Sequence, residues 1–261
     1  MKKACVLVFA GLDPSGGAGI QADIQAISDA GAHPLPIITA LTVQDNQHVY
    51  AVYPVAASML IEQVNALITQ GTAINAIKIG IVGSIANARA IADAIIQLRE
   101  SHPTLPVVLD PVLASGHGDV LTQGDAVQAL APVRRLATLI VPNLPEARAL
   151  CDGMDTLALQ AQRLLQESPH VMIKGGHGDG EEIINTWFHG DHQHEWRWPR
   201  LSGEYHGSGC TLASAIAAQL AQGVTMEAAL EAAQHYTQHS LAQAYAIASG
   251  QLIPHRLKEM L

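Results

Sequence analysis

The stretch ACVLVFAGLDPSGGAGIQADIQAISDA, residues 4–30, contains three consecutive patterns that together indicate a fold. The apolar run Ala4–Ala10 predicts a buried strand, and a glycine-rich loop over residues 11–19 follows it. Apolar residues then recur at helical spacing over Gln21–Ala30. A strand, a loop and a helix in this order form the repeating unit of a parallel sheet.

The same alternation continues along the chain and predicts an α/β fold with a central, mostly parallel sheet and helices on both faces. The segments Val49–Val55 and Thr186–Trp198 are expected to form antiparallel or flanking strands, the second as a surface hairpin. We find no repeat and no linker, so a single domain over residues 1–261 is expected. Further strands are predicted at Pro36–Leu41, Ala76–Ile79, Pro106–Asp110, Leu139–Val141 and His170–Lys174, and further helices at Ala56–Thr69, Ser84–Glu100, Gly124–Leu130, Pro145–Leu150, Thr156–Ser168, Thr211–Gln222 and Met226–Ala246.

Composition narrows the class of protein. Apolar residues make up 49% of the chain and charged residues 14%, which is typical of a large buried core. The formal net charge of −9 argues against a nucleic-acid-binding surface. The first apolar run is too short for a secretion signal, and no run is long enough to span a membrane. Three cysteines without a CxxC pair favour a reduced, cytoplasmic protein.

Polar and glycine-rich segments follow the predicted strands repeatedly. They read GLDPSGGAG, TVQDN, GIVGS, DPVLASGHGD, PNLPEA, KGGHGDG and HGSGC. In an open parallel sheet, ligands bind in the crevice beyond the carboxyl ends of the strands. We therefore expect these loops to converge on one site.

The first loop matches neither a dinucleotide fingerprint nor a lysine-containing phosphate loop. Gly11 and its neighbours could allow close approach of the backbone to a ligand, or simply tight packing. Asp23 lies early in the next helix, where a structural role and a ligand contact are both open. Gln44 could pair with a small nitrogen heterocycle through its amide, or be a solvated loop residue.

Charged residues at three later strand ends have the chemistry of a phosphate and metal site. Asp110 ends an apolar strand and could orient a metal or water, or begin a turn. Asn143 could cap the following helix, and Glu146 in its first turn could hold Mg²⁺ through waters. Lys174 ends a buried strand, where a cation is costly unless it faces an anion, so we expect a phosphate contact.

The segment HGSGC opens the predicted helix Thr211–Gln222. Gly207, Ser208 and Gly209 leave backbone N–H groups unblocked at a helix start, an arrangement that receives anions. Cys210 follows at a position where the helix dipole lowers a thiol pKa, although an inert packing cysteine is the alternative. His206 is close enough in sequence for a Cys/His pair to be considered, on weak evidence.

Seven of these motifs, in order from about Val6 to Gly223, resemble the hydroxymethylpyrimidine/phosphomethylpyrimidine kinases of the ribokinase-like superfamily. They are AGLDPSGGAGIQADIQAIS, ITALTVQDN, IKIGIVGS, VLDPVLASGHGD, VPNLPEA, IKGGH and YHGSGCTLASAIAAQLA. The family commonly has Met where this chain has Ile81, and a different segment before HGSGC.

The resemblance implies phosphorylation by ATP and Mg²⁺ of 4-amino-5-hydroxymethyl-2-methylpyrimidine, and then of its monophosphate, in thiamine biosynthesis. A homodimer is also implied. By similarity, Gln44 would bind the pyrimidine beside Asp23 and Gly11. Lys174, Asp110 and Asn143 would lie at the ATP site, with Asp110 and Glu146 organising the metal. Gly207–Cys210 would form the anion hole over the transferred phosphoryl group, with Cys210 as proton acceptor or only part of its wall.

Two rival functions stay open at this stage. A pyridoxal kinase of the same superfamily would act on a similar hydroxymethylated heterocycle, and Gln44 favours the aminopyrimidine instead. A non-catalytic pyrimidine-binding module would not need Asp110, Glu146, Lys174 and a glycine-rich anion hole. A sugar kinase is less consistent with Cys210, because many ribokinase-like enzymes have Asp at that position.

Overall fold

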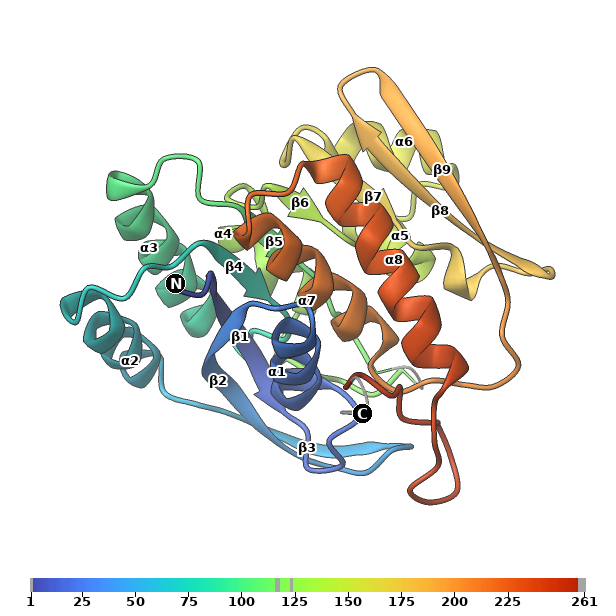
Figure 1. The fold of residues 1–261 in the computed structure, drawn as a ribbon, viewed down its shortest axis with the longest axis horizontal. Helices are drawn as coiled ribbons and strands as arrows, with labels where there is room; N and C mark the ends of the chain where they lie inside the picture. The colour runs from blue at the N-terminus through green and yellow to red at the C-terminus, as the bar shows by residue number, and fades with distance from the viewer. Residues whose placement is uncertain (1, 116–117, 123, 258–261) are drawn as a thin grey trace.

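In the computed structural model, which describes residues 2–115, 118–122 and 124–257, the strands form one sheet in the order β3-β2-β1-β4-β5-β6-β7-β8-β9. The strands β2, β1, β4, β5, β6 and β7 run parallel, while β3, β8 and β9 are antiparallel to their neighbours. The predicted α/β fold with a mostly parallel sheet is confirmed (Figure 1). The strands are β1 Cys5–Leu12, β2 His33–Gln44, β3 Val49–Pro54, β4 Ala76–Ile79, β5 Val107–Leu109, β6 Leu139–Ile140, β7 His170–Ile173, β8 Glu182–His189 and β9 His192–Pro199.

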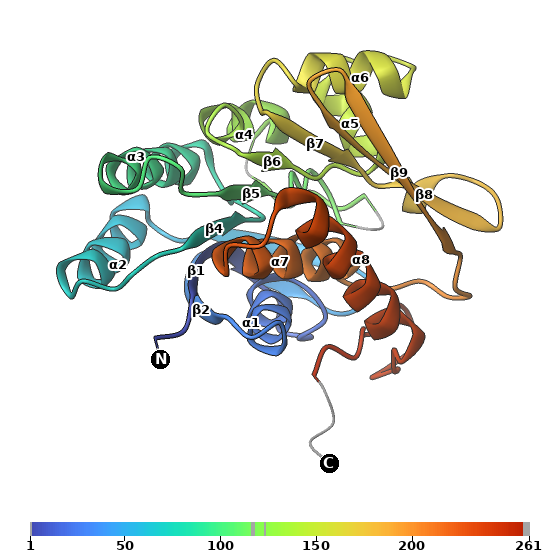
Figure 2. The same cartoon turned by 45° about the horizontal axis from the view of Figure 1, so that its top comes forward.

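Helices cover both faces of this sheet, as Figure 2 shows from a second direction. The helices α1, α7 and α8 pack on one face, and α2 to α6 pack on the other. Among the described residues, no helix combines the length and hydropathy that crossing a membrane requires. The helices are α1 Gly19–Asp29, α2 Ala57–Thr69, α3 Ile85–Ser101, α4 Ala126–Arg134, α5 Leu144–Leu150, α6 Leu157–Leu164, α7 Ser208–Ala221 and α8 Met226–Ala242, with a 3-10 turn η1 at Gly175–His177.

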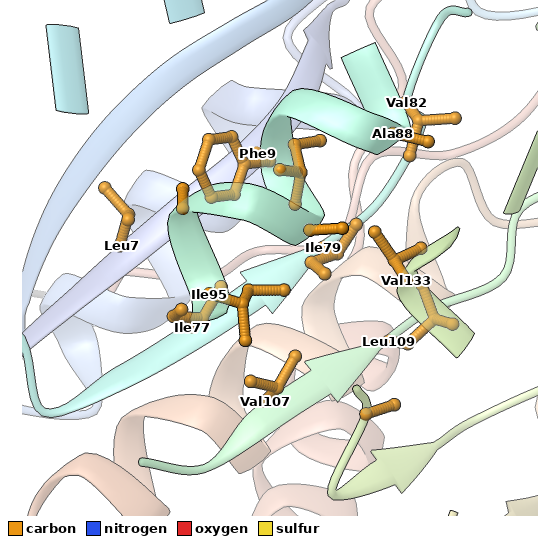
Figure 3. Packing of buried hydrophobic residues seen from close by; sticks show 14 of the residues in the cluster. Leu7, Phe9, Ile77, Ile79, Val82, Ala88, Ile95, Val107, Leu109 and Val133 are labelled. Carbon is orange, nitrogen blue, oxygen red and sulfur yellow. The ribbon is translucent and has the colours of Figure 1, made fainter. Parts of the chain in front are cut away.

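Alternate side chains of the central strands enter two cores. On β1, Leu7 and Phe9 pack under α2 and α3, whereas Val6 and Val8 face α1 and α7. Figure 3 shows Phe9, Ile79 and Ile95 of α3 within one cluster of buried hydrophobic residues. Alanines dominate the buried side of α7, so this helix can approach the sheet closely. Burial on both faces explains why the strands read as continuous apolar runs rather than alternating ones.

Several boundaries differ from the prediction. The strand β2 continues to Gln44 because its last residues pair with β3 in an antiparallel ribbon. The helix α4 continues to Arg134, beyond the predicted end at Leu130, and α7 begins at Ser208 rather than Thr211. Gly116 and His117 of the predicted DPVLASGHGD loop lie outside the described residues.

The strand order fixes where a site can form. The chain passes from β1 to β2 on one side and later returns to β4 on the other side of β1. The loops at the carboxyl ends of β1 and β4 therefore diverge, which leaves a crevice at a topological switch point. The helix α7 packs against α1, β1 and β4, and it therefore begins beside this crevice.

Candidate active site

A cleft of about 590 Å³ opens at the carboxyl ends of the parallel strands. Loops that follow β1, β2, β4, β5, β6 and β7 line it, together with the start of α7. This volume lies in the range of small-molecule sites. The structure brings together, around this cleft, all the sequence-predicted site residues except Asp23: Gly11, Gln44, Asp110, Asn143, Glu146, Lys174, Gly207, Ser208, Gly209 and Cys210.

The start of α7 has the geometry of an anion-binding helix end. Gly207 is its N-cap with a φ of 77°, and no side chain in the described part of the protein caps this end of the helix. A side chain on Gly207 would be strained at this φ, and its Cβ would also overlap the Gly17 carbonyl. The first N–H groups of the helix thus stay available on the side of the cleft.

An ion pair lies directly opposite this helix start. The Lys174 ammonium donates to Asp110 Oδ1 at 2.8 Å, and both side chains are largely buried. A Cβ built on Gly209 would lie 3.0 Å from Lys174 Nζ and 3.5 Å from Asp110 Oδ2. The glycine therefore permits the close approach of the helix start to a cation and a carboxylate. The helix-start N–H groups and the Lys174 ammonium are suited to bind and neutralise phosphate charge.

Asn143 and Glu146 form a capping box at the start of α5. The Glu146 N–H donates to Asn143 Oδ1 at 2.8 Å, and the Asn143 N–H donates to Glu146 Oε2 at 2.7 Å. The structural role weighed for Asn143, as the N-cap, is thus confirmed. Burial raises the pKa of Glu146 to about 7, a shift that the Lys174 charge opposes and the Asp110 charge reinforces.

Cys210 lies in the first turn of α7, in the wall of the cleft. Burial raises the pKa of its thiol to about 11, although the Lys78 ammonium opposes that shift. The expected lowering of this pKa by the helix dipole is therefore wrong in direction, because loss of solvation outweighs it. His206 does not pair with Cys210 in the structure; its Nε2 lies 2.8 Å from Asp13 Oδ2.

Asp23 is fully buried and does not line the cleft. Its two carboxylate oxygens accept hydrogen bonds from Lys78 Nζ at 2.8 and 2.9 Å, and Ser214 donates to one of them at 2.7 Å. The structure thus corrects the predicted placement of Asp23 beside the substrate. Its partner Lys78, although fully buried, is among the residues that line the cleft. Burial lowers the pKa of Lys78, but the interactions with Asp23, Cys210 and Asp110 together outweigh burial, so the net pKa is raised.

Sequence reasoning missed several residues around the cleft. Lys78 could have been found, because a lysine in the apolar strand AIKI is costly without a buried partner. Arg256, which contacts the loops around Gly17 and His206, has no such signal in its own sequence neighbourhood. Asp13 is also buried, and it accepts a hydrogen bond from the Ala18 N–H across the glycine-rich loop.

Gln44 and Gly11 lie at the β1–β2 end of the cleft. The Thr42 hydroxyl donates to the Leu12 carbonyl at 2.7 Å and so joins the end of β2 to the loop that starts at Gly11. A Cβ on Gly11 would find only ordinary contacts, the nearest at 3.6 Å, so packing alone does not require this glycine. Gly19 is different: its φ is 60°, and a Cβ there would overlap the Gly11 carbonyl.

A relay of amides supports the opposite end of the cleft. The Gly175 N–H donates to Asn185 Oδ1 at 3.0 Å, and Asn185 Nδ2 donates to Gln234 Oε1 at 2.9 Å. Trp198 Nε1 donates to the same Gln234 oxygen at 3.0 Å. These bonds fix the loop after Lys174 against β8, β9 and α8. Trp198 and Gln234 themselves face the cleft.

Comparison with known proteins gives consistent matches. The phosphomethylpyrimidine kinase family model matches residues 13–255. A hydroxymethylpyrimidine/phosphomethylpyrimidine kinase of Rhizobium meliloti (strain 1021) is 36% identical over 256 residues, which cover 95% of this chain and 94% of the relative. The thiamine biosynthesis multifunctional protein ThiED of Corynebacterium efficiens is 33% identical over 253 residues, which cover 94% of this chain and 34% of that protein.

Solved structures extend the comparison to the fold. The ADP complex of Bacillus subtilis pyridoxal kinase superposes with a TM-score of 0.85 at 25% identity and covers 98% of both chains. A phosphomethylpyrimidine kinase of Clostridium difficile 630 gives a TM-score of 0.75 at 29% identity, covering 92% of this chain and all of that one.

The fold, with the start of α7 at the cleft, is that of a ribokinase-like kinase. Within that class, the chain belongs to the phosphomethylpyrimidine kinase family.

Proposed function

We propose that the protein transfers the γ-phosphoryl group of ATP to the hydroxymethyl oxygen of 4-amino-5-hydroxymethyl-2-methylpyrimidine, and then a second phosphoryl group to the resulting monophosphate, in thiamine biosynthesis. The observation that carries this proposal is the uncapped start of α7, which lies opposite the Lys174–Asp110 pair inside one cleft. Such a site holds a phosphoryl group between backbone N–H donors and a cation. Family membership supports the choice of pyrimidine.

The two ends of the cleft take different parts of the substrates. The pyrimidine lies at the β1–β2 end, where the Gln44 amide pairs with the ring nitrogen and amino group and Gly11 allows close approach of the ring. The nucleotide enters from the β7–β8 end, where Lys174 meets its phosphates and Asn143 borders them. The anion hole, Gly207–Cys210, lies between the two.

Asp110 and Glu146 fit the donor set of Mg²⁺. Lys174 donates to one oxygen of Asp110, and the Asn143 N–H donates to one oxygen of Glu146. Within the described residues, no protein donor contacts the second oxygen of either carboxylate. The described residues contain no group of three or more His, Cys, Asp and Glu side chains that could hold a metal. Two carboxylates together with waters and substrate phosphates are typical of Mg²⁺ sites. Bound there, Mg²⁺ supplies charge neutralisation at the nucleotide phosphates.

In the transfer step, the hydroxymethyl oxygen forms a bond to the γ-phosphorus as the bond from that phosphorus to the β–γ bridging oxygen breaks. ADP leaves, and the hydroxyl proton passes either to Cys210 or to the transferred phosphoryl group. The anion hole N–H groups and Lys174 stabilise the charge that spreads over the equatorial oxygens. With a thiol pKa of about 11, Cys210 is protonated near neutral pH, so only its minor thiolate form accepts the hydroxyl proton. Phosphoryl transfer needs no covalent nucleophile.

Steady-state turnover of ATP with the pyrimidine alcohol, its monophosphate and pyridoxal, measured in parallel, tests the proposal. We expect the largest kcat/KM for the pyrimidine alcohol and measurable turnover of its monophosphate. Tight binding of the pyrimidine without ATP consumption would instead identify a non-catalytic binding module. For Cys210→Ala, near-normal kcat excludes a role as proton acceptor and leaves the residue only a place in the wall of the anion hole.

A pyridoxal kinase is the second candidate, because the Bacillus subtilis pyridoxal kinase superposes on this chain with a TM-score of 0.85. Both activities require a hydroxymethyl group on a nitrogen heterocycle. The Gln44 amide favours the aminopyrimidine, and a clear preference for pyridoxal in the parallel assay would reverse this choice.

The proposal also includes a cytoplasmic homodimer, and its mass in solution can be measured by sedimentation equilibrium.

A further inference from the structure

Arg256 is a buried arginine with no acidic partner among the described residues. Its side chain is 2% exposed and is the largest fully buried side chain among the residues that the structure describes. Within residues 2–115, 118–122 and 124–257, no carboxylate forms an ion pair with its guanidinium, whereas the buried Lys78 and Lys174 ammonium groups each have one. A buried charge without a counter-ion is costly, so its hydrogen bonds have to compensate.

Those hydrogen bonds reach segments that are far apart in the sequence. The guanidinium donates from Nε to Thr211 Oγ1 at 2.8 Å, and one terminal nitrogen donates to the carbonyls of Gly17 and His206. The other terminal nitrogen lies 3.4 Å from Gln25 Oε1 on α1. One side chain thus connects the glycine-rich loop after β1, the segment before α7 and the first turn of α7.

The contacts surround the residue that shapes the anion hole. Thr211, which accepts from Arg256, donates its own hydroxyl proton to the Gly207 carbonyl at 2.8 Å. The His206 carbonyl belongs to the peptide that leads into Gly207, and a Cβ on Gly207 would lie 2.9 Å from the Arg256 guanidinium. Asp13 and His206 join the same two loops through their own hydrogen bond. The orientation of the first N–H groups of α7 therefore depends on this group of contacts.

We infer that Arg256 is a positioning residue for phosphoryl transfer, which holds the Gly207 peptide so that the anion hole N–H groups point at the transferred group. This inference rests on the proposed kinase function. The guanidinium does not line the cleft and touches no reacting atom. It acts through Thr211 and the carbonyls of Gly17 and His206, and its positive charge, which no described carboxylate pairs with, favours an anion at the nearby helix end. The residue lies just beyond the segment 13–255 that matches the family model.

The test compares Arg256→Met, Arg256→Ala and the control Arg134→Met. Arg134 is also largely buried but pairs with Glu167 and does not line the cleft. At a temperature where circular dichroism shows all variants folded, we expect Arg256→Met to lower kcat by about 10²-fold, as loss of an anion-hole donor does. The KM for the pyrimidine should change by less than about 3-fold, because positioning acts on the transition state. Guanidinium ion at millimolar concentration should restore part of kcat in Arg256→Ala.

A second readout separates failure of this inference from failure of the proposed function. ADP with fluoroaluminate mimics the transferring phosphoryl group, and its binding is measured as a shift in thermal melting without any turnover. We expect the wild type and Arg134→Met to melt higher with ADP and fluoroaluminate than with ADP alone, and Arg256→Met to lose this increment while still binding ADP. If Arg256→Met keeps both the increment and kcat, or loses only what Arg134→Met loses, the inference is wrong. A wild type that shows the increment but phosphorylates no pyrimidine overturns the proposed function alone.

Discussion

Gly209 shows how a single missing side chain can shape a site. A Cβ added to Gly209 would lie 3.0 Å from Lys174 Nζ, which is too close for the Lys174–Asp110 ion pair to keep its present position. Gly209→Ala should therefore push the ammonium away from the phosphoryl position and lower kcat by about 10²-fold, with a smaller effect on the KM for the pyrimidine. Gly176→Ala is the matched control, since a Cβ there meets nothing within 4 Å although Gly176 also borders the cleft. Equal kcat for the two variants would rule out the anion-hole geometry.

Glu146 makes stability depend on pH in an unusual direction. Its pKa is about 7 in the folded protein against an ordinary value of 4.5, so unfolding releases a proton between these values. The free energy of unfolding should consequently fall as the pH rises from about 4.5 to about 7. Denaturant unfolding of the ligand-free protein across this range measures the slope. Glu146→Gln should make the curve flatter, and an unchanged slope would show that another group is responsible.

At the scale of elements, the start of α5 combines a structural role with a position in the cleft. Asn143→Ala removes an N-cap, which should cost about 1 kcal/mol of stability. It also removes the acceptor that fixes the Glu146 N–H, which loosens the first turn of α5 that positions the Glu146 carboxylate, so the KM for ATP·Mg²⁺ should rise.

Thr156→Ala provides the control, because Thr156 caps α6 through the Leu159 N–H and does not line the cleft. Its stability loss should be of similar size while its KM stays at the wild-type value. Thermal melts and initial-rate kinetics on both variants decide the matter. A rise in KM for both would mean that general destabilisation, rather than the placement of Glu146, is the cause.

At the scale of the whole molecule, the Lys78–Asp23 pair joins the sheet to the helices on one face. Lys78 comes from β4, Asp23 from α1, and Ser214 of α7 completes the contact. Lys78→Met leaves the Asp23 carboxylate buried and unpaired, and should lower the free energy of unfolding by about 3–5 kcal/mol. The double variant with Asp23→Leu should recover much of that loss. Urea denaturation of the single and double variants measures this coupling, which would be absent if the double variant were no more stable than Lys78→Met.

The general architecture could be predicted from the sequence because its signals are local and repeated. Each parallel strand is an apolar run, and each is followed by polar or glycine-rich residues, so the position of the cleft follows from the sheet order. The side-chain partners could not be predicted in this way. The sequence around Asp23 is consistent with a ligand-binding residue, but in the structure its carboxylate is paired with Lys78, which lies 55 positions away in the sequence. The pKa of Cys210 likewise depends on how completely other segments bury it, which no local pattern shows.

The hydrogen bond between Trp198 and Gln234 gives the protein a built-in optical reporter. The indole of Trp198 borders the cleft at the end where we propose that the nucleotide binds, whereas Trp187 and Trp196 stack with each other along the β8–β9 hairpin. Intrinsic fluorescence should therefore change when ADP binds, and Trp198→Phe should abolish the change while the emission of the other two indoles stays constant. A signal that survives in Trp198→Phe would place the nucleotide elsewhere. If Trp198→Phe abolishes the signal, a fluorescence titration of the wild type and of each variant above gives its nucleotide affinity without a label or a coupled assay.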